Sequence, residues 1–251
     1  MRKTFILVFF AILCLSVFAD DKKSLEKWAV EQRMPEEIDG VKIYRPIIAN
    51  GKFSFGDYVN LQTKLSDMSA FTRALVFAVN DLDPETESIE AVDFDNKRFV
   101  VSRALTGEDG HNIYAFSEAF QIDGGSLSFM IPEIIVKYKD KLVINKRVPF
   151  QKLEPEKKEA HFAFVEEFSL LNSQFIAKMI DAIKNSNVEP IKDLIAVKAG
   201  KVVKGMNPTE VLVTQGKPDN ITESGKLTKW MYGSYLIVIF SDGVVERVVN
   251  F

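Results

Sequence analysis

The chain has 251 residues, of which 47% are hydrophobic and 27% are charged, and its formal net charge is −3. This composition is typical of an ordinary globular protein. The mild acidity argues against a general nucleic-acid binder, because such a protein needs a basic surface to neutralise phosphates. We therefore expect no nucleic-acid partner.

The first nineteen residues have the pattern of a signal peptide. Arg2 and Lys3 provide positive charge, residues 4–18 contain no charged residue, and Ala19 fits a cleavage site. Cleavage there would remove Cys14, the only cysteine, and with it any disulfide or thiol chemistry. Leu13, not a small residue, precedes Cys14, so we expect no lipid attachment. These features predict export to the periplasm; a retained N-terminal anchor is the alternative.

Residues 20–40 are expected to be a helical lead-in, with Ser24 as a candidate N-cap and Pro35 as its end. From residue 41 onwards, short apolar or alternating runs recur between turn-forming residues. They lie at residues 41–48, 58–65, 74–79, 88–94, 98–103, 113–120, 126–131, 133–138 and 142–150. With no helix expected among them, residues 41–154 are predicted to form an antiparallel β-sandwich of immunoglobulin-like type. A ligand-holding β-barrel is the alternative.

Residues 155–188 are expected to form one long amphipathic helix. Phe164, Phe168, Leu171, Phe175 and Met179 follow one another at intervals of three and four, which places them on one face. Such a wide aromatic stripe requires a partner surface, either in this chain or in another molecule.

Residues 189–251 are predicted to form a separate α+β domain. A short helix is expected over residues 190–199, and a second begins with Asn207 as N-cap, Pro208 at the first position and Glu210 positioned to complete a capping box. Gly216 and Pro218 end that helix. Strands are expected at residues 230–232, 235–240 and 244–250, the last two joined by a hairpin at Asp242-Gly243.

This order and these residues resemble the SmpA/OmlA (BamE-like) domain of bacterial envelope proteins. The resemblance is carried by Gly205, Met206, Glu210, Val211, Gly216, Lys217, Pro218, Trp230, Tyr232, Gly233, Phe240, Asp242, Gly243 and Val244. It implies a fold of two helices followed by three antiparallel strands, related to β-lactamase-inhibitor-protein-like domains. It also implies a setting at the periplasmic side of the outer membrane.

Catalytic or metal-binding patterns are not apparent. His111 and His161 have no metal-ligand partner at a useful spacing. Gly124-Gly125 is expected to be a hairpin turn. An acidic run could suggest calcium, but it lacks the glycine of an EF-hand loop and contains Pro84; its members are Asp81, Asp83, Glu85, Glu87, Asp93 and Asp95. We expect a solvated loop there, no tight metal and no cofactor.

Taken together, the sequence predicts a non-catalytic protein of the bacterial envelope that acts as an interaction or scaffold module for other envelope proteins. The alternative is a periplasmic binder of a small apolar ligand, held inside a β-barrel. A hydrolase with two distant carboxylates is a third hypothesis.

Overall fold

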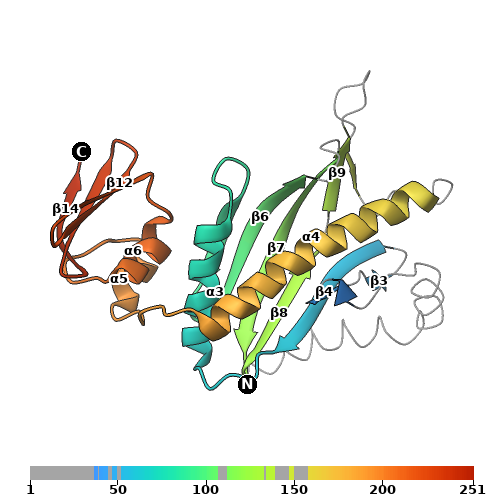
Figure 1. The fold of residues 1–251 in the computed structure, drawn as a ribbon, viewed down its shortest axis with the longest axis horizontal. Helices are drawn as coiled ribbons and strands as arrows, with labels where there is room; N and C mark the ends of the chain where they lie inside the picture. The colour runs from blue at the N-terminus through green and yellow to red at the C-terminus, as the bar shows by residue number, and fades with distance from the viewer. Residues whose placement is uncertain are drawn as a thin grey trace. The chain divides into compact units, whose positions relative to one another are not determined.

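The computed structural model describes residues 37–38, 40–44, 47–49, 52–106, 112–132, 134–138, 147–149 and 158–251. The predicted signal peptide, the lead-in helix and His111 lie outside these residues. Over the described residues the protein is a β-rich α+β fold of mainly antiparallel sheets and a few helices (Figure 1). It divides into two compact units, one with residues up to 58, 102–119 and 128–177, the other with residues 59–101, 120–127 and 178–251.

Eight strands form the larger sheet, in the order β10-β9-β7-β8-β4-β3, with β6 on β7 and β5 on β6. Strand β9 pairs antiparallel with both β7 and β10. A further two-stranded sheet pairs β1 (Glu37–Ile38) with β2 (Val41–Lys42). The strands of the larger sheet are β3 (Ile47–Ala49), β4 (Lys52–Asn60), β5 (Ser88–Asp93), β6 (Arg98–Thr106), β7 (Asn112–Asp123), β8 (Ser126–Ile131), β9 (Ile134–Tyr138) and β10 (Arg147–Pro149).

Helix α4 (Lys158–Asn185), whose residues up to 177 belong to the first unit, lies across the sheet (Figure 1). The ring of Phe168 contacts three rings from the strands, with centroid distances of 4.7 Å to Phe55, 5.7 Å to Tyr114 and 5.0 Å to Phe116. All four side chains are buried. The long helix is therefore confirmed, and the sheet is the surface that its stripe required.

The expectation of a strand at residues 74–79 is wrong, because helix α3 (Asp67–Asp81) occupies this region. Ser66 caps it by accepting a hydrogen bond from the Ser69 N–H. Ala70, Phe71, Ala74 and Ala78 recur at helical spacing and are buried. The continuous apolar run from Leu75 to Val79 has no period of its own, and such a run fits a buried helix as well as a strand.

In the second unit, α3 packs on the sheet through Phe71, whose ring lies 5.5 Å from that of Phe94 and 6.0 Å from that of Phe99. Phe99 stacks on Phe120 at 5.2 Å. The turn at Gly124-Gly125 has positive φ at both glycines, as expected of a tight hairpin. The carboxylate of Asp67, in the first turn of α3, accepts hydrogen bonds from both glycine amides.

The C-terminal part of this unit contains α5 (Leu194–Lys198), α6 (Pro208–Gln215) and a four-stranded sheet, β11-β12-β13-β14. The strands are β11 (Asn220–Ser224), β12 (Leu227–Tyr232), β13 (Leu236–Ser241) and β14 (Val244–Asn250), and each pairs antiparallel with the next. The sequence did not predict β11, because every residue in it is exposed and no apolar pattern marks it. Its pairing with β12 makes it a strand.

Candidate functional site

The expected capping box of α6 is present and extends to a neighbouring loop. The Asn207 side chain accepts from the Glu210 N–H at 2.9 Å, and a Glu210 carboxylate oxygen accepts from the Asn207 N–H at 2.8 Å. The other carboxylate oxygen accepts from the N–H groups of Lys192 and Asp193. Asn207 Nδ2 donates to the Pro190 carbonyl. Since both side chains are fully buried, this pair fixes the loop before α5 to the start of α6.

Other residues of the SmpA/OmlA-like pattern also have structural contacts. Gly205 donates its N–H to the Val245 carbonyl, and the Val245 N–H donates to the Met206 carbonyl, so the segment before α6 pairs with β14. Trp230 and Phe240 have ring centroids 4.8 Å apart. Met206, Val211 and Phe240 are buried. These residues hold helices and sheet together.

Turns and helix ends account for the remaining residues of the pattern. The Tyr232 hydroxyl donates to the Gly216 carbonyl at the end of α6, at 3.2 Å. Gly233 donates its N–H to the Asp219 carboxylate, next to Pro218. Asp242 and Gly243 have φ of 49° and 79°, the left-handed pair that a two-residue hairpin needs. The hairpin prediction is confirmed.

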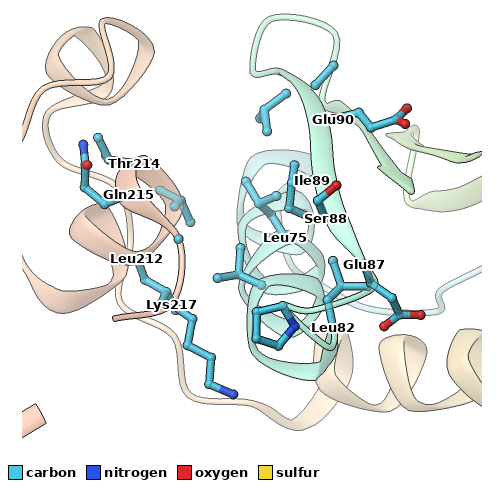
Figure 2. A pocket seen from close by; sticks show the side chains of 16 residues that line it. Leu75, Leu82, Glu87, Ser88, Ile89, Glu90, Leu212, Thr214, Gln215 and Lys217 are labelled. Atoms are coloured by element: carbon cyan, nitrogen blue, oxygen red, sulfur yellow. The ribbon is translucent and has the colours of Figure 1, made fainter. Parts of the chain in front are cut away.

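A groove of about 440 Å³ lies between the C-terminal end of α6 and the surface formed by α3 and β5 (Figure 2). Its floor is apolar, with side chains of Leu75, Val79 and Leu82 on one side and Leu212 on the other. Ile89 of β5 extends the floor, and in Figure 2 its side chain lies next to that of Leu75. The groove has the volume of a small-molecule site, and its lining mixes apolar and polar groups.

Polar groups occur at the rim of the groove. Glu87, Ser88 and Glu90 come from the β5 side, and Gln215 and Lys217 from the α6 side. Lys217 Nζ lies 3.5 Å from the Asn80 carbonyl, which links the two sides. The lining contains neither histidine nor cysteine.

The acidic run next to the groove is a folded turn. The Asp83 carboxylate accepts from the Glu85 N–H and the Thr86 hydroxyl, and Glu87 accepts from the Asp83 N–H. Asp93 accepts from the Asn96 side chain and from the amides of Asp95 and Asn96, and these hydrogen bonds hold its pKa below the usual value. Within the described part of the chain, no three acidic, histidine or cysteine side chains come together to hold a metal ion.

A buried polar cluster lies in the first unit, beneath α4. Arg103 Nη1 donates to Asn172 Oδ1 at 3.2 Å, and Asn172 Nδ2 donates to Glu118 Oε1 at 3.0 Å. The Arg103 guanidinium lies 3.7 Å from the centre of the Phe175 ring and its Nη1 lies 3.9 Å from Glu118 Oε2. Glu118 Oε2 and Ser169 Oγ are buried without a hydrogen-bond partner in the described structure.

The surroundings of this cluster raise the pKa of one carboxyl group, that of Glu118. Burial disfavours the charged form of Glu118 and raises its pKa from 4.5 to about 7, although Arg103 and Asn172 act in the opposite direction. The alternation of residues along β7 marks Glu118 in the sequence, although no role was predicted for it. Glu118 occupies an inward position of β7, in alternation with the buried Tyr114, Phe116 and Phe120.

The remaining sequence candidates do not form a site in the described residues. His161 lies in α4, and its side chain is outside what the structure describes. None of the helices in the described ranges is both long enough and apolar enough to cross a membrane.

No known protein family and no curated protein matches this chain. Among solved structures, the chain is similar to a TBP-like protein from Parabacteroides distasonis, with 15% identity and a TM-score of 0.47, over 56% of this chain and 98% of that one. It is also similar to a DUF4468 family protein from Bacteroides ovatus, with 8% identity and a TM-score of 0.44, over 58% of this chain and 94% of that one.

Proposed function

We propose that this protein is a non-catalytic interaction module of the bacterial cell envelope, which binds an apolar segment of an envelope protein in the groove between α3, β5 and α6. The observation that carries the proposal is the apolar floor of this groove, from Leu75, Val79, Leu82 and Leu212, beneath a polar rim. Each of these four side chains is at most 9% exposed, so covering them supplies only a small part of the binding free energy, at about 25 cal/mol per Å² of apolar surface.

The envelope setting rests on the sequence. The signal-like residues 1–19 support export, and the SmpA/OmlA-like pattern supports a position peripheral to the outer membrane. The order of α5, α6 and the following antiparallel sheet is compatible with that likeness. For residues 41–154, an immunoglobulin-like sandwich would need a second sheet facing the first. Helices α3 and α4 pack on the described sheet, so we do not extend that part of the hypothesis.

Site-specific photocrosslinking tests the groove. A photoreactive residue replaces Ser88, which is an exposed residue of the groove, in the protein expressed with its full N-terminal sequence in bacteria. We expect discrete protein adducts after irradiation of intact cells. Lys201, also exposed and absent from the lining, is the control position. Equal adduct patterns at both positions, or no protein adduct at Ser88, would contradict the proposal.

A small apolar ligand is the second candidate occupant, because 440 Å³ lies within the range of about 300–1,000 Å³ found for small-molecule sites. Its site would be this groove and not the interior of a barrel. Mass spectrometry of organic extracts from purified protein distinguishes the two occupants. A bound molecule of defined mass that is lost in Ile89→Glu, but kept in the matched Ile221→Glu at an exposed position, would favour the ligand.

A further inference from the structure

The C-terminal sheet has one face covered by its own helices. Buried side chains on this face are Tyr232 of β12, Leu236, Val238 and Phe240 of β13, and Val245 of β14. The hydrogen bond from Tyr232 to Gly216 places the end of α6 on this side. Figure 1 shows α5 and α6 on one side of the four strands.

The opposite face, here called the outer face, is defined by the strand registers. Side chains of paired residues in an antiparallel sheet lie on the same face, and neighbours along a strand alternate. One row across the strands is Met231, Ile237 and Val249, the next is Lys229, Ile239 and Arg247, and the third is Leu227, Ser241 and Val244. The edge strand adds Asn220, Thr222 and Ser224.

Apolar side chains occupy the centre of the outer face and remain accessible. Leu227 and Val244 are 44% and 40% exposed, respectively. Ile237 and Ile239, in the middle of β13, are half-buried and not fully covered. An antiparallel sheet that faces water usually has polar residues on that side. The apolar centre is therefore a surface that a partner would bury.

The charges on the outer face have one sign. The ionisable residues that the registers place on it are Lys229 and Arg247, which lie on either side of Ile239 across the sheet, while Glu246 lies in the bulge of β14 and has no registered partner. Neither forms an ion pair with any described residue. Glu223 belongs to the other face, because it pairs with Thr228. The face thus combines an apolar centre with two cations that have no counter-charge in the described chain.

We propose that the outer face binds an amphipathic helix of a partner protein that lies along β13 and carries acidic residues on both sides of its apolar stripe. Lys229 and Arg247 are two strand spacings apart, about 10 Å at about 4.8 Å per spacing. This matches the diameter of an α-helix, about 10–12 Å with side chains. The stripe would contact Ile237 and Ile239, while carboxylates on the two flanks would reach the two cations.

An anionic membrane surface also combines apolar groups with negative charge. Two basic residues contribute only about 1 kcal/mol each to binding an anionic leaflet, which is too little for stable attachment without a deeper apolar insertion. A protein helix better satisfies two cations separated by one helix diameter. This inference rests on the proposed role as an interaction module, but it uses residues that do not line the groove, so either surface can fail its test independently.

The test uses the full chain after export and two synthetic helical peptides of about 20 residues that share one leucine stripe. The stripe is flanked by glutamates in one peptide and by lysines in the other. We expect the glutamate peptide to bind about tenfold tighter at low salt, since two exposed ion pairs each contribute a fraction of the binding free energy. Chemical-shift mapping should place it on Ile237 and Ile239.

Charge reversal at both cations, Lys229→Glu with Arg247→Glu, should invert the preference. The matched control, Lys201→Glu with Lys204→Glu, changes two exposed lysines outside the outer face and should keep it. Equal binding of the two peptides, or an unchanged preference in the reversed variant, would overturn the proposal. Binding to vesicles with anionic lipid, without binding to either peptide, would overturn it in favour of a membrane surface.

Discussion

Replacing Glu118 with glutamine should remove most of the pH dependence of stability between about pH 5 and about pH 8. The carboxyl is fully buried, and one of its oxygens has no hydrogen-bond partner in the described structure. Its pKa is raised from 4.5 to about 7, chiefly by burial. Because the folded state holds its proton more tightly than the unfolded state, the stabilising effect is complete below about pH 4.5 and is lost as the pH rises through 7.

The size of the change in the free energy of unfolding follows from the shift in the pKa of Glu118. One pKa unit corresponds to about 1.4 kcal/mol, so the free energy of unfolding should fall by roughly 3 kcal/mol from the acidic to the alkaline end of this window. Above about pH 8 the contribution is constant. The amide introduced by Glu118→Gln is neutral at every pH and keeps an acceptor for the Asn172 side chain, so the variant should lack this fall in the free energy of unfolding.

Urea unfolding at a series of pH values, followed by circular dichroism, measures this profile. Histidine side chains ordinarily titrate in the same window, and the chain has two, so the informative quantity is the difference between the wild type and Glu118→Gln. Glu189→Gln, at an exposed carboxyl, is the matched control and should retain the wild-type profile. If Glu118→Gln has the same slope as the wild type, the buried carboxyl does not titrate as the geometry requires, and the reasoning is refuted.

Three further substitutions test the architecture through the free energy of unfolding. Glu210→Ala leaves the amides of Lys192, Asp193 and Asn207 without their acceptor, so a loss of about 3 kcal/mol or more is expected; Glu210→Gln, which keeps one acceptor, should lose less. Phe168→Ala should cost about 3–5 kcal/mol through the cavity it leaves among three rings, whereas Gln174→Ala on the exposed side of α4 should change little. Gly243→Ala should cost roughly 1 kcal/mol, purely through φ, because no atom lies within 4 Å of the added Cβ; a cost near zero would argue against the left-handed turn.

The sequence by itself determined those elements whose signals are local. The cap at Asn207, the hairpin at Asp242-Gly243 and the long helix with Phe168 on its buried face all follow from side-chain chemistry within a few residues. Capping groups and left-handed turn residues act on their own backbone, so a single sequence suffices to recognise them. The spacing of the apolar residues likewise shows which side chains share one face of a helix.

Only the tertiary structure decided the features that depend on distant pairing. The run from Leu75 to Val79 lies within helix α3, whose Phe71 packs against Phe94, in the turn after β5, and Phe99 of β6. Exposed β11 became a strand through hydrogen bonds to β12.

The candidate sites needed the tertiary structure as well. The groove joins residues 75–92 to residues 212–217, and Glu118 meets Asn172 from a helix more than fifty positions away. A cavity, a buried charge and a row of cations across strands arise when segments far apart in the chain approach one another. Local propensity contains no information about that approach, because it reflects only the conformations that neighbouring residues favour.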